Sequence, residues 1–499
     1  MFSLLYLDPK ENDRNTGIKQ EVLLTDLNLD RVIDKICEDW EGDVHSFYET
    51  LPSSKEEEDY RRGIYSDIKD PEIHDFFMDY FKSIKTRDEY TAHKENAYEL
   101  IQKQAWFLRE VYIYVSSNLK LLEDLRSKNV SSRGLKDLIA FLESVTNDKD
   151  FISLKDEVNS LWDRLSSFRV ILTYDRGRFT LTNAEGVGEY ESFLSDLFPG
   201  EKKYFRPPFA DKEYFSDLEQ EILKLFTRKN KTFEKDLDKF CKEHPDPLNS
   251  NIWQIEKEIE YYLAYYKFEE KMKLHGFEMC TPERGEDVLK AGQLYDLALA
   301  IASLDTGKKV VPNELLLDDK EKFFVLTGPN QGGKTTYARS IGQLIFLSKL
   351  GLDVPAVSAE VPYYKNLWTH FSVEESIESG RGKLMDELER LKPIMNGSIE
   401  GDFVVINELF TTAANYDAVE MGKKVLKKLT SKGYHGIYVT HLGELVSACD
   451  GIVSLRATLD KDNERTFIIG RLTPEYINTI DKEIEKYELT YEQLKERLS

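Results

Sequence analysis

The residues best suited to chemistry lie in a glycine-rich loop between two apolar patterns. The run Phe323–Leu326 predicts a short buried strand, and apolar residues recur at helical spacing over 337–350. The loop between them has the spacing of a phosphate-binding P-loop, Gly328-x-x-x-x-Gly333-Lys334-Thr335. Glycine lets backbone N–H groups turn inward, and the start of the helix adds a positive end.

The loop predicts a site for ATP and Mg²⁺. Lys334 is expected to reach the β- and γ-phosphates, and the Thr335 hydroxyl to bind Mg²⁺. The alternative is a strand-to-helix turn with no ligand, which the complete motif disfavours. The residues expected to hold ATP are Gly328, Pro329, Asn330, Gln331, Gly332, Gly333, Lys334, Thr335 and Thr336.

A second apolar run, Phe403–Ile406, ends in the polar pair Asn407 and Glu408. An open α/β sheet binds ligands at the carboxyl ends of its strands, so Glu408 is the candidate that orients the attacking water. The run resembles a Walker B strand, in which an aspartate usually precedes the glutamate, and Asn407 takes the place of that aspartate. Its amide can accept a hydrogen bond from the Mg²⁺ shell but carries no charge, so weaker Mg²⁺ retention or slower turnover is expected.

A third run, Ile437–Thr440, ends in His441. A histidine at this edge could hydrogen-bond the γ-phosphate or the attacking water, which makes His441 a catalytic candidate beside Glu408. The alternative is a purely structural histidine.

The composition is that of a soluble, folded chain of two to four domains, with 499 residues, 41% of them hydrophobic and 32% charged. No apolar run approaches the ~20 residues that span a bilayer, and the charged N-terminus lacks a signal-peptide pattern. We expect a cytoplasmic protein with no membrane partner. Its four scattered cysteines, without a C-x-x-C pair, are expected to be reduced and mostly buried.

The net charge of −23 bears on nucleic-acid binding. Residues 301–499 hold 25 Lys and Arg against 30 Asp and Glu, a net −5, so residues 1–300 carry the other −18. An acidic surface repels a phosphate backbone, so DNA binding would need a local basic patch. The candidates are Arg176, Arg178, Lys229 and Lys231, for which a solvated surface is the alternative.

Upstream of the loop, two helical regions flank a short β segment. Apolar residues between 101 and 122 recur at three- and four-residue steps without Pro or Gly, which predicts a long helix. Residues 168–182 read as a β-hairpin with a basic turn, and 212–275 turn helical again. From about Thr281, β-rich runs alternate with helical patterns, which is typical of a parallel sheet with crossover helices.

The ordered motifs resemble the MutS family of DNA-repair ATPases. Residues 327–336 differ from the family's TGPNMGGKST only at Gln331 and Thr335. Residues 311–314 resemble its VPND segment, which lies against the adenine and adds Asn313 to the ATP-binding residues. Three further stretches resemble conserved segments of the family. Residues 379–388 resemble SGRSTFMVEM, residues 406–409 resemble IDEL, and residues 440–445 resemble THYHEL.

The resemblance implies an α/β P-loop NTPase of ABC or MutS type, with a mainly parallel sheet. This domain would occupy 286–499, including a C-terminal helical tail. It would follow an N-terminal segment, 1–60, and a mostly α-helical lever domain, 61–285, with a small β-containing clamp-like insertion at about 150–212. The resemblance also implies a homodimer in which the partner's signature segment completes each ATP site.

Departures from the family pattern limit the functional expectation. The signature serine and threonine align with Gly382 and Lys383, so Gly380, Gly382 and Lys383 are the candidates for contact in trans. The mismatch-reading domain is expected to be missing, with the tripeptide 47–49 a chance match to its Phe-x-Glu wedge, and no nuclease-like domain is expected after Leu498.

Two functional hypotheses remain open. One is a dimeric ATP-gated clamp that hydrolyses ATP and binds DNA structures other than mismatches. The other is a nucleotide-gated module with weak or degenerate ATPase activity that binds a protein or ribonucleoprotein.

Overall fold

The fold is that of a computed structural model, which describes residues 2–7, 20–40, 44–167, 170–175, 178–183, 222–224, 226–228, 230–372, 383–397, 401–460 and 464–471. Contacts divide the chain into two units. The first unit joins Met1–Pro9 to Asp67–Leu263, and the second joins Lys10–Ser66 to Ala264–Ser499.

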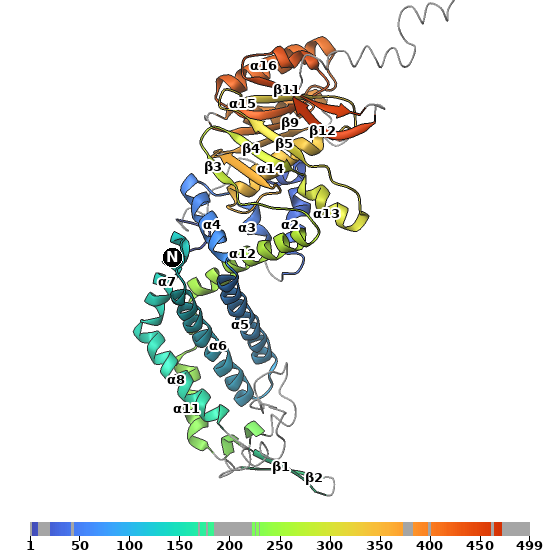
Figure 1. The fold of residues 1–499 in the computed structure, drawn as a ribbon. Coiled ribbons are helices and arrows are strands. Elements are labelled where there is room, and N and C mark those ends of the chain that lie inside the picture. Colours follow the sequence, from blue (N-terminus) through green and yellow to red (C-terminus); the bar gives the residue numbers. More distant parts are fainter. Residues whose placement is uncertain are drawn as a thin grey trace, which may run out of the picture. The chain divides into compact units, whose positions relative to one another are not determined.

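The first unit is built from long helices, of which α5 and α6 run side by side (Figure 1). The long helix predicted from the apolar spacing between 101 and 122 is confirmed by α6. Asp70 starts α5, since its carboxylate accepts the backbone N–H groups of Glu72 and Ile73. The helices are α5 (Pro71–Asn96), α6 (Leu100–Ser127), α7 (Arg133–Thr146), α8 (Lys149–Ser166), α11 (Lys231–Glu243) and the part of α12 (Ser250–Leu274) that ends at Leu263.

The predicted β-hairpin is present in this unit. Strands β1 (Val170–Asp175) and β2 (Arg178–Asn183) pair antiparallel, with Asp175 opposite Arg178. The turn between them lies outside the described residues.

The second unit contains a six-stranded sheet with helices on both faces (Figure 1). Its strand order is β12-β11-β6-β10-β9-β8, and every pairing is parallel except that of β12 with β11. The β-rich runs that begin at Phe323, Phe403 and Ile437 are confirmed as strands β6, β9 and β10. The strands are β6 (Phe323–Thr327), β8 (Leu367–Phe371), β9 (Phe403–Asn407), β10 (His435–Val439), β11 (Ile452–Leu459) and β12 (Arg465–Arg471).

Alternating side chains decide which helix covers which face of this sheet. Phe323 and Val325 pack into one cluster with residues of α15 (Lys383–Asn396) and α16 (Asn415–Ser431). The P-loop helix α14 (Lys334–Lys349) contacts β8, β9 and β10. A smaller sheet has the order β3-β7-β4-β5 and leads into α13 (Leu297–Thr306). Its strands are β3 (Glu283–Gly285), β4 (Leu289–Leu294), β5 (Asn313–Leu317) and β7 (Ser358–Pro362).

Four N-terminal helices belong to this second unit, and their grouping with the C-terminal part of the chain was not predicted from the sequence. Leu27 packs against Gly342 of α14, where a Cβ would lie 2.5 Å from a Leu27 methyl carbon. Asp26 accepts hydrogen bonds from Thr369 of β8 and Arg390 of α15, at 2.8 and 2.7 Å. The helices are α1 (Gln20–Asp26), α2 (Leu29–Cys37), α3 (His45–Glu49) and α4 (Lys55–Ile68).

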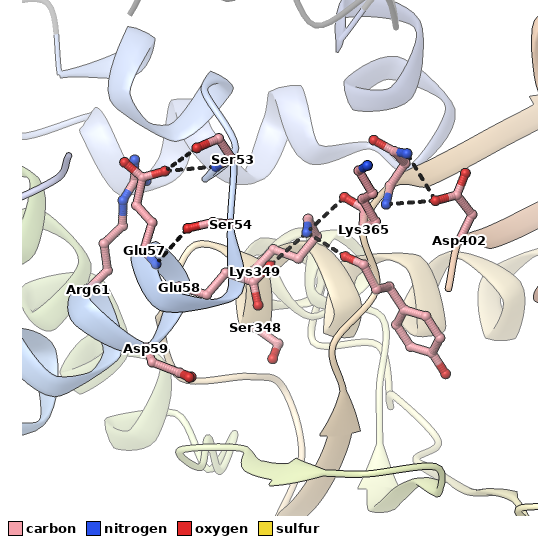
Figure 2. A network of polar contacts seen from close by, with 12 residues as sticks. Ser53, Ser54, Glu57, Glu58, Asp59, Arg61, Ser348, Lys349, Lys365 and Asp402 are labelled. Carbon is pink, nitrogen blue, oxygen red and sulfur yellow. Dashed lines mark hydrogen bonds and ion pairs between the residues drawn. The ribbon is translucent and has the colours of Figure 1, made fainter. Parts of the chain in front are cut away.

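A buried ion pair joins α4 to the far end of the P-loop helix (Figure 2). The Lys349 ammonium lies 2.6 Å from the Glu58 carboxylate and donates to the carbonyl oxygen of Tyr364 at 2.6 Å. Glu58 is bound on its other side by Arg284, at 2.9 Å. The side chains of Lys349 and Glu58 are 4% and 1% exposed, so water does not weaken this pair.

Lys349→Met is expected to lower the free energy of unfolding of the second unit by about 3 kcal/mol, because it leaves a carboxylate buried with one cation fewer. Chemical denaturation followed by circular dichroism measures this loss. The double variant Glu58→Gln, Lys349→Met should recover part of it, since neither charge is then left buried. If the double variant lost as much free energy of unfolding as Glu58→Gln and Lys349→Met lose together, the result would contradict a direct interaction between the two side chains.

The fold also bears on three smaller features of the sequence. In the part of the chain that the structure describes, no helix is long and apolar enough to cross a membrane. The four cysteines are free thiols, with Cys37 buried and Cys241, Cys280 and Cys449 partly buried. The tripeptide 47–49 lies in helix α3, with the Tyr48 side chain fully buried.

Candidate nucleotide-binding site

The glycine-rich loop leaves β6 and enters α14 at Lys334. Gly328 and Gly333 have φ values of +130° and +87°, a backbone region that L side chains rarely adopt. A Cβ at Gly328 would also lie 3.0 Å from the Ala457 side chain of β11. These glycines are therefore required by the path of the loop.

The Lys334 side chain lies inside this loop. Its ammonium donates to the carbonyl oxygens of Gly328 and Pro329, both at 2.9 Å, and the residue is 5% exposed. Burial lowers the pKa of Lys334, while the charge of Glu408 raises it. A cation held in a partly desolvated cradle of this kind is suited to phosphate oxygens.

The predicted magnesium ligands lie together. The Thr335 hydroxyl, at the start of α14, donates to the amide oxygen of Asn407 at 3.1 Å. Asn407 is the last residue of β9, and its side chain therefore reaches the carboxyl edge of the sheet. Hydroxyl and amide oxygens are ligands that Mg²⁺ accepts.

Glu408 and His441 form the second pair at this edge. His441 Nε2 lies 2.9 Å from Glu408 Oε1, and both side chains remain partly exposed, at 47% and 33%. The Glu408 N–H donates to the carbonyl of Val439 and so joins the ends of β9 and β10, while the Thr440 N–H donates to the carbonyl of Leu326 in β6, both at 3.0 Å. A carboxylate and an imidazole in contact beside the loop are suited to orienting a water molecule.

A cavity of about 650 Å³ opens beside the loop, within the usual range for small-molecule sites. Asn313 lines it, although its amide is engaged with backbone groups, donating to Phe467 O at 3.1 Å and accepting from Ile469 N at 2.7 Å. Phe467 also lines the cavity and was not predicted, since nothing near it in the sequence marks the β12 strand as part of a site. The wall is completed by Lys308, Lys309, Tyr295 and Asp296 among others.

The region that carries this site is similar to known proteins. Residues 324–476, which include the loop, the Glu408–His441 pair and Phe467, match the family model for MutS domain V. The C-terminal part of this chain is therefore similar to domain V of MutS proteins.

The similarity to curated MutS proteins covers about a third of this chain. The DNA mismatch repair protein MutS of Pelotomaculum thermopropionicum is 26% identical over 170 residues, which is 33% of this chain and 20% of that protein. The same protein of Streptococcus sanguinis is 28% identical over 167 residues, covering 32% and 20%. The chain thus spans about a fifth of the length of the curated MutS relatives that it matches.

Not every predicted site residue is placed by the structure. Gly380, Gly382, Arg176 and Lys229 lie outside the described residues. Lys383 is the first residue of α15, Arg178 begins β2 and Lys231 begins α11. Among the described residues no group of three or more His, Cys, Asp or Glu side chains forms a metal site.

Proposed function

We propose that this chain is an ATPase of MutS type that binds ATP with Mg²⁺ in the loop of residues 328–336. The observation that carries the proposal is the convergence of Lys334, the Thr335–Asn407 pair and the Glu408–His441 pair at one edge of the sheet. Positive φ at Gly328 and Gly333 further supports a phosphate cradle.

Each of these residues then has a distinct role. Lys334 exchanges its two carbonyl partners for the β- and γ-phosphate oxygens, and the main-chain N–H groups of the loop hold the same phosphates. Thr335 and Asn407 hold the magnesium shell. The metal, when bound, neutralises charge that develops on the phosphates.

The Glu408–His441 pair acts on the water. Glu408 orients the attacking water and accepts its proton, and the Nε2–H group of His441 donates to the carboxylate and holds its orientation. Asn313 and Phe467 line the cavity in which the adenine ring of ATP would lie.

We further propose that two copies of the chain form an ATP-gated clamp on DNA. The relatives are named DNA mismatch repair proteins, and we propose DNA structures other than mismatches as the ligands of this chain. Contacts in trans would come from Gly380, Gly382 and Lys383, and phosphate contacts from Arg176, Arg178, Lys229 and Lys231.

A salt titration of DNA binding tests this proposal. Fluorescence anisotropy with labelled duplex and branched DNA, at 50 and 200 mM salt, should show binding that requires a non-hydrolysable ATP analogue and weakens with salt. Solution scattering of the same samples should report a dimer with the analogue bound. Undetectable DNA binding at low salt would remove DNA as the partner.

The second candidate function is a nucleotide-gated module for a protein or ribonucleoprotein. The charge of −18 on residues 1–300 favours it, since this half of the chain repels nucleic-acid phosphates. A pull-down with the ATP-trapped Glu408→Gln protein separates the two candidate functions. Recovery of DNA supports the DNA clamp, whereas recovery of protein without DNA supports the protein- or ribonucleoprotein-binding module.

Asn407→Asp is expected to lower the Mg²⁺ concentration for half-maximal turnover by about tenfold, because it adds a charge beside Thr335 without changing the shape of the side chain. Phosphate release at varied Mg²⁺ measures this. Asn407→Ala is the control, since it removes the acceptor of the Thr335 hydroxyl and should raise the requirement. An Asp variant that needs as much Mg²⁺ as the natural chain would place Asn407 outside the magnesium shell.

A further inference from the structure

The backbone turn that follows Glu408 adopts an unfavourable conformation. Glu408 and Phe410 have φ values of +57° and +60°, and neither is glycine. Such residues are disfavoured by about 1 kcal/mol each in isolation, so the surrounding structure must hold the turn. The direction of the Glu408 side chain depends on this turn.

A buried carboxylate holds it. Glu387 of α15 is 1% exposed, and its Oε2 accepts the backbone N–H of Phe410 at 2.9 Å. Its Oε1 lies 3.4 Å from the Thr411 hydroxyl, which donates to it. Hydrogen bonds to an ionised acceptor are about twice as strong as neutral ones.

The helix that carries Glu387 is itself fixed to the edge of the sheet. His370 of β8 is fully buried, and its Nε2 lies 3.1 Å from the carbonyl oxygen of Glu387. Burial lowers the pKa of His370 to about 4, so the ring is neutral at pH 7 and donates its Nε2–H to that carbonyl. Arg390 donates to the carbonyl of Phe371 at 2.9 Å and to Asp26.

We infer that Glu387 is a positioning residue for Glu408: it locks the turn 408–411 and makes the orientation of the water-binding carboxylate depend on the position of α15. The inference rests on the proposed ATPase function for its consequence, but its structural claim concerns the turn itself. Glu387 hydrogen-bonds the turn and is not among the residues that line the cavity, so its expected effect is on turnover and not on ATP affinity.

Asp402 offers a matched control. It is a fully buried carboxylate directly before β9, accepting N–H groups from Asn366 at 2.9 Å and Trp368 at 2.8 Å. It precedes β9, whereas Glu387 acts beyond the other end of that strand. Glu387→Ala and Asp402→Ala therefore remove equivalent groups at opposite edges, and both are expected to lower the melting temperature.

Two measurements test the inference. Glu387→Ala should lower kcat for ATP about tenfold with KM unchanged, while Asp402→Ala leaves kcat within about twofold. Glu387→Gln should restore most of the activity, since an amide oxygen can still accept the Phe410 N–H. Hydrogen exchange of the peptide that spans 408–411 should speed up about tenfold in Glu387→Ala and not in Asp402→Ala.

The exchange result decides the inference whatever the natural turnover is. Unchanged exchange at 408–411 in Glu387→Ala overturns it, as does a loss of kcat that Asp402→Ala matches. A natural chain without ATP turnover would overturn the proposed function alone, and faster exchange in Glu387→Ala would then still support the role of Glu387 in the turn.

Discussion

A Glu408→Gln protein is expected to bind ATP with unchanged affinity and to hydrolyse it about 100-fold more slowly than the natural chain. Glutamine keeps the size of the side chain, and its amide oxygen can still accept from His441. It cannot accept a proton from the attacking water, so binding is kept and chemistry is lost.

Phosphate release measures the turnover of this variant, and filter binding measures the ATP that it retains. Glu444→Gln is the matched control, because it makes the same change at an exposed position three residues after His441. It should leave both quantities unchanged. If Glu408→Gln turned over ATP as fast as the natural chain, another group would have to orient the attacking water, and Glu408 would have only a structural role in its turn.

Lys334→Met is expected to weaken ATP binding about 100-fold, because it removes the cation that faces the β- and γ-phosphates. In contrast to this loss of ATP affinity, the variant should not lose folding stability. Burial lowers the pKa of Lys334, which means that the folded state disfavours the charged form. Replacing the ammonium with an apolar group of similar length should therefore leave the melting temperature of the ligand-free protein unchanged or raise it.

The control for this variant lies at the other end of the same helix. Lys349 is as deeply buried as Lys334 but is paired with Glu58, so Lys349→Met should lower stability and spare ATP affinity. Calorimetric titration with an ATP analogue and thermal unfolding of both variants give the two readouts. Equal ATP affinity in Lys334→Met and the natural chain would contradict the proposed phosphate site.

The features predicted from sequence are those that local residues determine. An apolar run, a glycine turn and a helical repeat follow one another from Phe323 to Leu350, and each needs only its neighbours to form. The Glu408–His441 contact could also be predicted, because polar residues that end parallel strands meet at one edge of the sheet.

The rest depends on contacts between distant parts of the chain. Glu58 gives no local sign that it pairs with Lys349, which lies 291 residues away. Glu387 lies in the stretch that resembles the family's signature segment, but nothing in the sequence indicates its contact with Phe410, which only the fold brings about. Phe467 enters the cavity from an antiparallel edge strand whose pairing the sequence does not specify.

The contact of Leu27 with α14 affects how the chain can fold while it is being synthesised. Gln343 donates to the Leu27 carbonyl across 316 residues, so α1 and α2 leave the exit tunnel long before their binding surface has been translated. At roughly 10 residues per second that delay is on the order of half a minute. During this time the apolar faces of both helices lack the surface that covers them in the folded chain.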